Sequence, residues 1–320
     1  MTARIEITDE AGCPAWELTS PGGRLRATFV PALNMLCTSL RHNGEELLHP
    51  RAGVAAYAEK GKTCGIPLLH PWANRLSGDR YEVDGHAVTL VQNAKPPTRD
   101  ANGLPNHGLL GGRSAWKVVE TTACDDDATL HARFDFDGED LLANFPFPHR
   151  VDLHVAVDDS GLAMTTVVTP TGGDPVPVSF GYHPYFRLPG APREDWLVTL
   201  PVTRHLELDS RSIPTGVVRD VRFDTARLGD RTFDDGFTGI VEPRVFVLEG
   251  GGRRLEIAFD EAFPFVQVFA PAGSDFLCIE PMTAQANAMV RGGADLPRAG
   301  AGGFSATWSV RVGPGAAADT

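Results

Sequence analysis

Long hydrophobic runs are absent from this 320-residue sequence, and with them the signals for membrane insertion. No stretch approaches the roughly 18 consecutive apolar residues that a membrane-spanning helix needs. Residues 1–20 also lack a basic start followed by an apolar segment, which is the pattern of a secretory signal. We therefore expect neither a membrane partner nor secretion.

Cysteine is scarce and isolated. The five cysteines stand at positions 13, 37, 64, 124 and 278, and no two form a CxxC pair. A disulfide framework or a zinc knuckle needs paired spacing, so the sequence predicts neither. A reducing, cytoplasmic location fits this pattern best.

Positive charge is in short supply. The chain has 29 Lys and Arg against 41 Asp and Glu, which gives a formal net charge of -12. Nucleic acids and anionic membranes attract basic surfaces, so the charge argues against both partners. It weighs only lightly against a phosphorylated substrate, because a local arginine cluster would outweigh the global sign.

Helix-forming segments are few, whereas strand patterns recur along the whole chain. Only residues 51–60 combine good helix formers. Apolar and polar residues alternate with a period of two in four segments, at 130–136, 151–157, 255–259 and 308–312. This alternation is typical of antiparallel strands with one buried face.

No flexible linker, charge block or fixed-period repeat divides the chain. Large all-β sandwiches reach this length as one unit. The sequence therefore predicts an all-β protein, a large antiparallel β-sandwich with few short helices. We expect a single domain over residues 1–312 and a disordered tail over 313–320.

The segment HPYF at 183–186 places a histidine beside two aromatic residues. Pro184 favours extended backbone at His183, as at the end of a strand. Histidine titrates near neutral pH, so His183 is a candidate proton donor beside a flat, partly apolar ligand such as a sugar. The alternative is a packed, hydrogen-bonded core histidine.

Two polar residues interrupt apolar strands near the end of the chain. Glu280 stands in FLCIEP, where a buried carboxylate is costly unless it is paired or functional, and we expect Pro281 to end this strand. A glutamate pointing to solvent from an edge strand is the alternative. Gln267 stands in FVQVF and requires a hydrogen-bond partner if it is buried.

Six short segments occur in an order that resembles the galactose mutarotase or aldose 1-epimerase family. They are WANRL at 72–76, NHGLLGG from position 106, HPYF at 183–186, FDDGF at 233–237, FVQVF at 265–269 and CIEP at 278–281. The resemblance implies the family's many-stranded β super-sandwich, and an enzyme that needs no cofactor and no metal. It also implies the activity, an isomerase that interconverts the α and β anomers of an aldohexose by opening and reclosing the ring. In that reaction Glu280 would be the general base and His183 the general acid.

The resemblance assigns sugar binding to five further residues, and each has a second interpretation. The five are Asn74, Arg75, His107, Asp234 and Gln267. The second interpretation is a turn residue for Asn74, a surface ion-pair partner for Arg75 and a solvated loop histidine for His107. A register in which Asp235 replaces Asp234 is also open.

Several nearby residues have no assigned role at this stage. Trp72, Tyr185 and Phe186 either stack on a pyranose ring or belong to the core. His70 and Arg187 depart from the family pattern. They either contact a substituent of the sugar or lie on a solvated rim.

Two other enzyme classes compete with the aldose 1-epimerase interpretation. A hexose-6-phosphate 1-epimerase would use the same chemistry and a basic cluster, for which Arg75, Arg113 and Arg187 are available. A glycoside hydrolase would pair Glu280 with Asp234 but would leave the histidines without a role.

Two non-enzymatic or metal-dependent classes also compete. A sugar-binding or sensing domain has no need for both His183 and Glu280. A metalloprotein would require His70, His107 and His183 to converge, but their spacing matches no ligand motif. The sequence leaves open which sugar is the substrate, and whether the protein is a monomer or a homodimer.

Overall fold

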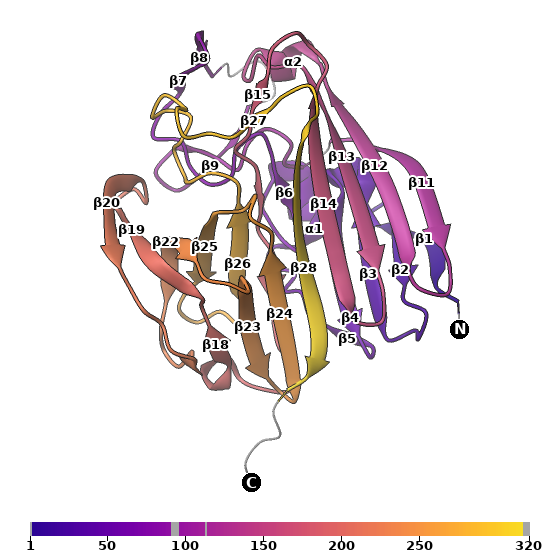
Figure 1. Cartoon of the computed structure of the whole chain (residues 1–320). Coiled ribbons are helices and arrows are strands. Elements are labelled where there is room, and N and C mark those ends of the chain that lie inside the picture. The colour runs from indigo at the N-terminus through magenta and orange to yellow at the C-terminus, as the bar shows by residue number, and fades with distance from the viewer. Residues whose placement is uncertain (1, 91–95, 113, 316–320) are drawn as a thin grey trace.

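The structure is a computed structural model, and it describes residues 2–90, 96–112 and 114–315. Antiparallel β-sheets are the main secondary structure of this part of the chain, and its helices are short (Figure 1). Alternating burial along the strands explains the architecture, because each sheet can bury its apolar face only against another sheet.

The largest sheet has nine strands in the order β11-β12-β13-β14-β28-β24-β23-β18-β21. Their bounds are Lys117–Ala123 (β11), Ala128–Phe136 (β12), His149–Val157 (β13), Gly161–Pro170 (β14), Phe304–Pro314 (β28), Arg253–Phe259 (β24), Val245–Gly250 (β23), Leu197–Thr199 (β18) and Ala226–Arg227 (β21). Strand β28 joins the two halves of this sheet, because it pairs with β14 on one side and with β24 on the other.

Of the two further large sheets, the five-stranded one lies behind β11–β14, and the eight-stranded one extends to the left of the view (Figure 1). The five-stranded sheet consists of Arg4–Glu10 (β1), Cys13–Thr19 (β2), Leu25–Val30 (β3), Leu36–His42 (β4) and Glu45–Glu46 (β5). The eight-stranded sheet contains Pro214–Asp220 (β20), Val202–Leu208 (β19), Phe233–Ile240 (β22), Phe265–Ala270 (β25), Leu277–Met282 (β26), Gly181–Tyr182 (β16) and Leu68–Leu69 (β6), with Tyr185–Phe186 (β17) also paired to β26.

Short elements complete the described chain. Three two-stranded sheets pair Arg80–Val83 (β7) with His86–Thr89 (β8), Thr98–Arg99 (β9) with Pro105–Asn106 (β10), and Val176–Pro177 (β15) with Arg298–Ala299 (β27). The helices are Gly53–Lys60 (α1) and Glu139–Leu142 (α2), with 3₁₀ turns at Pro31–Leu33 (η1) and Arg193–Asp195 (η2).

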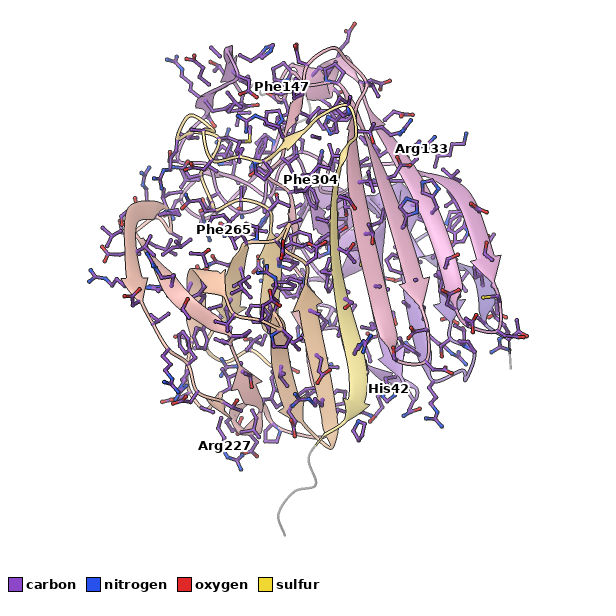
Figure 2. All side chains as sticks on the ribbon, viewed as in Figure 1. His42, Arg133, Phe147, Arg227, Phe265 and Phe304 are labelled. Atoms are coloured by element: carbon purple, nitrogen blue, oxygen red, sulfur yellow. The ribbon has the colours of Figure 1, made fainter. Side chains whose placement is uncertain are left out.

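The main hydrophobic core lies between the nine-stranded sheet and the two other large sheets. One half of the core joins Leu153 on β13 to Phe29 on β3, and the other contains Ile257 on β24 and Ile279 on β26, all with no exposed surface. Figure 2 shows how densely side chains fill the space between the sheets. This packing is what a β-sandwich requires of its inner faces.

The structure confirms the predicted fold class and the positions of the main elements. Each of the four segments with a period of two lies within a strand, in β12, β13, β24 and β28, and residues 51–60 overlap α1. Strand β28 continues to Pro314, two residues beyond the expected end of the domain at 312. Of the expected tail, residues 316–320 lie outside the described part of the chain. The prediction of a single domain stays a prediction.

The expectation that Pro281 ends its strand is wrong. Strand β26 continues through Pro281 to Met282, with Pro281 opposite Val266 of β25. A proline lacks the N–H that a continuing strand would donate. Here β26 keeps its pairing, and Glu280 lies inside the sheet rather than at a strand end.

Within residues 2–90, 96–112 and 114–315, none of the helices has the length and apolar character required to span a bilayer.

Burial of the central strand β28 predicts a clear difference between two valine truncations. Val310 has no exposed surface and lies between Leu162 and Ile257, whereas Val217 on β20 is 46% exposed. We expect Val310→Ala to lower the free energy of unfolding by about 2 kcal/mol, because it removes buried methyl groups and leaves a cavity. Val217→Ala, the matched control, should change it by less than about 0.5 kcal/mol. Urea unfolding measures both, and equal effects would contradict the proposed core.

Candidate active site

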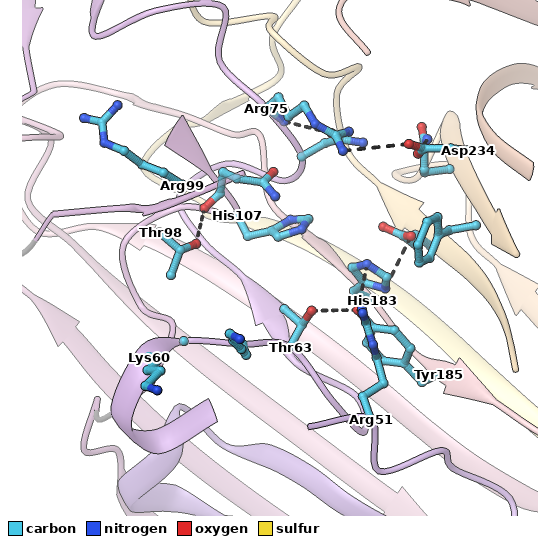
Figure 3. A pocket seen from close by; sticks show the side chains of 17 residues that line it. Arg51, Lys60, Thr63, Arg75, Thr98, Arg99, His107, His183, Tyr185 and Asp234 are labelled. Atoms are coloured by element: carbon cyan, nitrogen blue, oxygen red, sulfur yellow. Dashed lines mark hydrogen bonds and ion pairs between the residues drawn. The ribbon is translucent and has the colours of Figure 1, made fainter. Parts of the chain in front are cut away.

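A polar pocket of about 330 Å³ opens beside the eight-stranded sheet (Figure 3). All seven residues that the sequence analysis selected line it: Asn74, Arg75, His107, His183, Asp234, Gln267 and Glu280. They come from positions more than 200 residues apart in the chain. The fold thus brings the predicted residues together, although their roles remain predictions.

Strand β26 positions the histidine and the glutamate. It pairs with β16 and β17 along one edge, and His183 lies in the short break between those two strands. Gly181 permits this close approach, because a Cβ there would lie 2.5 Å from the carbonyl oxygen of Pro281. Glu280 projects from β26 itself, so both side chains are fixed by the same strand.

His183 and Glu280 form a buried pair. Nδ1 of His183 lies 3.3 Å from Oε1 of Glu280, and the two residues are only 6% and 2% exposed. Within the described chain this nitrogen is buried and makes no hydrogen bond of good geometry. The other ring nitrogen, Nε2, lies 3.0 Å from the hydroxyl of Tyr185.

Burial shifts the pKa values of this pair in opposite directions. It lowers the pKa of His183 well below the usual 6.5, and neighbouring His107 adds to the shift. It raises the pKa of Glu280 well above the usual 4.5, and the nearby Asp234 carboxylate adds to that shift. Both directions follow from the cost of placing charge in a low-dielectric site. In the free site, both shifts favour neutral His183 with protonated Glu280 over an imidazolium–carboxylate pair.

Two hydrogen-bonded side chains, Gln267 on β25 and Asp234 on β22, lie beside the pair of His183 and Glu280. Gln267 on β25 is directly opposite Glu280 on β26 and is 4% exposed. Its amide nitrogen donates to Oδ1 of Asp234 on β22 at 2.8 Å. Arg75 lies 3.8 Å from the other oxygen of Asp234. The buried glutamine thus has the partner that its position requires.

Adjacent aspartates on β22 point to opposite sides. Asp234 lines the pocket, whereas Oδ1 of Asp235 lies 2.9 Å from Nε2 of His205 on β19. This follows from the alternation of side chains along a strand. Of the two registers left open by the sequence, the structure favours Asp234 as the pocket residue.

Two loops place Asn74, Arg75 and His107 at the pocket. Asn74 and His107 have left-handed backbone conformations, with φ of 58° and 62°, and the amide of His107 donates to the carbonyl oxygen of Asn74 at 3.0 Å. This region is unfavourable for residues other than glycine, so surrounding contacts must hold it in place. Arg75 is held by its bond to Oδ2 of Asp100, at 2.9 Å, and by a bond to Oδ1 of Asn74.

The ring of His107 lies close to that of His183 in the pocket. Its ring centroid is 5.3 Å from that of His183, in an edge-to-face arrangement. Burial lowers the pKa of His107 to about 3, and the Arg75 guanidinium contributes to the shift. His107 is therefore a neutral imidazole at neutral pH, suited to exchange hydrogen bonds with a hydroxylated ligand.

Several pocket residues were not anticipated from the sequence. Arg51, Lys60, Lys62 and Thr63 come from α1 and its flanking segments. The helix itself was predicted, but no local pattern shows that it borders the pocket. Asp100, which orients Arg75, also lacked any sequence signal, because its role depends on a contact across 25 positions.

Trp72 and Phe186 follow the core interpretation, whereas both interpretations given for His70 are wrong. Trp72 and Phe186 have no exposed surface and belong to the hydrophobic core. His70 is 3% exposed, and its Nε2 lies 2.7 Å from Nε2 of His149. It is therefore neither a rim residue nor a partner of His107 and His183 in a metal site.

The arginines proposed to hold a phosphate do not form one cluster. Arg75 lines the pocket but is bonded to Asp100, whereas Arg187 is not among the residues that line it. Arg113 lies outside the described residues. A phosphate, if bound, requires other cations.

One group near the pair has the composition of a metal site. Candidate ligand atoms of His183, Cys278 and Glu280 lie within 4.8 Å of one another. Burial raises the pKa of the Cys278 thiol well above its usual value, and the Glu280 carboxylate adds to that shift. Metals bind the thiolate rather than the thiol. The group therefore fits proton transfer better than metal binding.

The fold defines the class of protein first. The structure superposes on a galactose mutarotase-like protein from Clostridium acetobutylicum with a TM-score of 0.84 and 18% identity, covering 98% of this chain and 99% of the other. A galactose 1-epimerase from Lactobacillus acidophilus gives a TM-score of 0.76 at 13% identity, covering 98% and 99%. The chain therefore has the galactose mutarotase-like fold.

The sequence then identifies the family. Residues 36–294 match the aldose 1-epimerase family, and the chain belongs to it, within the isomerase class. A galactose mutarotase from Rattus norvegicus is 29% identical over 152 residues. That match covers 47% of this chain and 40% of the rat protein, so it spans less than half of either.

The opposite orientation of Asp234 and Asp235 predicts a difference in sugar binding. Asp234→Ala should weaken binding of an aldohexose about tenfold, because it removes a charged hydrogen-bond acceptor from the pocket. Asp235→Ala, which loses contacts to His205 and to the backbone N–H of Asp234 but removes no group that lines the pocket, should change it less than about twofold. Calorimetric titration with galactose and glucose measures the dissociation constants. The pocket assignment fails if Asp235→Ala has the larger effect.

Proposed function

We propose that this protein is an aldose 1-epimerase that interconverts the α and β anomers of a hexose. The main support is the buried pair of His183 and Glu280, 3.3 Å apart in a polar pocket. Membership of the aldose 1-epimerase family gives the same reaction class. A binding or sensing domain would have no need to keep such a costly pair.

In the proposed mechanism, the two residues move protons to and from the sugar. Glu280 removes the proton from the hydroxyl on C1 while His183 protonates the ring oxygen, and the C1–ring-oxygen bond breaks to give the open-chain aldehyde. After rotation about C1–C2 the same residues act in reverse, and the ring closes on the other face. Proton transfer of this kind typically contributes a factor of about 10² to 10⁴.

The other pocket residues would hold the sugar during this cycle. Asp234 and Gln267 present a carboxylate and an amide on neighbouring strands, and Arg75 presents a guanidinium that Asp100 holds in place. Asn74 and neutral His107 would complete the contacts to hydroxyl groups. Fixing the sugar matters, because both protons must be transferred across short distances.

The shared proton determines which state of the pair is active. The mechanism requires one proton on the pair, residing on His183 when the sugar is bound. Burial favours the alternative with the proton on Glu280, whereas the positive charges of Arg75 and Arg51 favour the Glu280 carboxylate. We infer that sugar hydroxyls, which donate to the carboxylate, shift the proton towards His183.

A hexose 6-phosphate is the second candidate substrate, and one side of the pocket favours it. Lys60 and Lys62 line the pocket beside α1, and neither has an ion-pair partner within the part of the chain described. They differ from Arg75 and Arg99, which pair with Asp100 and Asp79. Unpaired cations at a pocket attract an anionic group.

A substitution at Glu280 tests the mechanism. Glu280→Gln keeps the shape and the hydrogen-bonding capacity of the side chain but removes the base, so the anomer exchange rate should fall at least about 100-fold. His183→Asn should reduce turnover to a similar extent. Exchange NMR on glucose, galactose and glucose 6-phosphate, after subtraction of the spontaneous rate, measures the loss and ranks the substrates.

Glu6→Gln, on the exposed strand β1, is the matched control and should retain the wild-type rate. A fully active Glu280→Gln protein would exclude the mechanism. No acceleration by the folded wild-type protein on any of the three sugars, together with sugar binding, would favour a sensor.

The pKa directions predict the acidic limb of the activity profile. At low pH the pair takes up a second proton and loses its base. Because the pKa of His183 is lowered well below 6.5, this loss should occur at a pH below 6.5. The profile of kcat/KM against pH checks this, and an acidic midpoint at or above 6.5 would contradict it.

The cytoplasmic location and the monomeric or dimeric state stay predictions.

A further inference from the structure

Two buried histidines outside the pocket are bonded directly to each other. Nε2 of His70 lies 2.7 Å from Nε2 of His149 on β13, and the two residues are 3% and 0% exposed. The ring of His149 stacks on Phe136 with centroids 4.5 Å apart, and the ring of His70 lies edge-to-face with the same phenylalanine at 5.8 Å. Neither histidine is among the residues that line the pocket, and the proposed reaction makes no use of them.

The contacts of the pair define where each proton lies. Nδ1 of His149 is 2.6 Å from the carbonyl oxygen of Phe147, which can only accept, so this nitrogen carries a proton. Burial lowers the pKa of His149 to about 4, so the ring is neutral at neutral pH and its Nε2 has no proton. Nε2 of His70 is therefore the donor, and Nδ1 of His70 is unprotonated. Within the described chain that Nδ1 is buried and has no partner.

Such a pair is a costly way to fill the space between the sheets. One polar atom of His70 is left unsatisfied. Replacing both partners of a buried hydrogen bond by apolar side chains is often nearly neutral for stability. Stability alone therefore gives no reason for two imidazoles at these positions, whereas a bond of fixed direction between two parts of the fold does.

His70 lies in a segment that is held by two of the large sheets. The backbone of this segment pairs with the eight-stranded sheet, where Leu69 on β6 lies opposite Gly181 on β16. The His70 side chain instead reaches β13 of the nine-stranded sheet. The chain is thus held from both sides shortly before Asn74 and Arg75 enter the pocket.

The carbonyl oxygen of His70 also holds the second loop of the pocket. It accepts hydrogen bonds from the amides of Leu109, at 2.8 Å, and Leu110, at 3.2 Å. Gly108 permits this close approach, because a Cβ there would lie 2.2 Å from the same oxygen. His107 directly precedes Gly108, so its position depends in part on the backbone of His70.

We propose that His70 is a positioning residue for sugar binding, and that it acts through its bond to His149. The bond fixes the backbone from which Asn74, Arg75 and His107 reach the pocket. This inference rests on the proposed function, in which those three residues hold the sugar. A hydrogen bond constrains the direction of the imidazole, whereas apolar packing has no preferred direction.

Two substitutions of His70 separate the bond from the packing. His70→Leu keeps a buried side chain of similar volume but cannot donate, so KM for the best of the three sugars named above should rise about tenfold, while kcat changes less than about threefold. His70→Gln retains an N–H close to the position of Nε2 and should keep KM within about threefold of the wild-type value. His154→Leu, at an exposed position of β13 outside the pocket, is the matched control and should change neither constant.

A double substitution shows whether lost packing alone explains the effect. His70→Leu leaves Nε2 of His149 buried without a donor, whereas neither imidazole remains when His149→Leu is added. The double variant should therefore lose less free energy of unfolding than the two single variants together. Its KM should nevertheless stay raised about tenfold. A double variant with the wild-type KM would overturn the inference, because packing alone would then hold the loops.

Two NMR measurements need no sugar. In ¹⁵N-labelled wild type at neutral pH, a scalar coupling should join the two Nε2 atoms across the hydrogen bond, with the proton on His70. An absent coupling, or a proton on Nδ1 of His70, would overturn the inference. Amide hydrogen exchange at Leu109 should be at least about tenfold faster in His70→Leu than in the wild type, and unchanged in His70→Gln. Equal exchange in all three proteins would also overturn it.

These results are separable from a failure of the proposed function. If the wild type does not accelerate anomer exchange, the proposed function fails. The dissociation constants of galactose and glucose and the exchange at Leu109 then decide the inference, which is overturned if His70→Leu has the wild-type values. Thermal unfolding of each variant identifies any loss that is due to misfolding.

Discussion

The site depends on one constraint, the pairing of strand β26 along both of its edges. On one edge β25 places Gln267 opposite Glu280, and on the other β16 and β17 hold His183 between them. Strand pairing fixes positions to a fraction of an ångström, which a mobile loop cannot do. The backbone positions of His183, Glu280 and Gln267 are therefore fixed by hydrogen bonds between strands, whether or not a ligand is bound. The loops that carry Arg75 and His107 complete a site whose centre is rigid.

Rigid burial has an electrostatic consequence for the chemistry. A carboxylate and an imidazolium that are both withdrawn from water are costly, and here this cost disfavours the charged form of each group. Two arginines near the pocket partly offset it for Glu280. The same low-dielectric setting would strengthen the hydrogen bonds of a ligand bound in the pocket. In this interpretation, the states with the proton on Glu280 and on His183 differ little in free energy. A bound hydroxyl group can therefore move the proton from one residue to the other.

The sequence predicted most of the fold, because period-two alternation records directly which face of a strand is buried, as in 130–136 and 151–157. It also predicted which seven residues share the pocket, since short segments in a fixed order carry a family resemblance. It failed where the outcome depends on distant neighbours. His70 looked like a rim residue, but it packs against His149, 79 positions away. Thr63 and Asp100 gave no signal, because their roles exist only once α1 and the loops are docked. Pro281 was misjudged, because a local rule about proline is overridden by pairing with β25.

The position of β28 bears on how the protein is made. This strand is the last in the described chain, and it joins β14 to β24 at the middle of the nine-stranded sheet. During synthesis from the N-terminus, the two halves of that sheet must wait, with their inner edges unpaired, until β28 emerges from the ribosome. Exposed strand edges are templates for wrong pairing with other chains. Nascent chains that stall before β28 are therefore the species that molecular chaperones would need to shield.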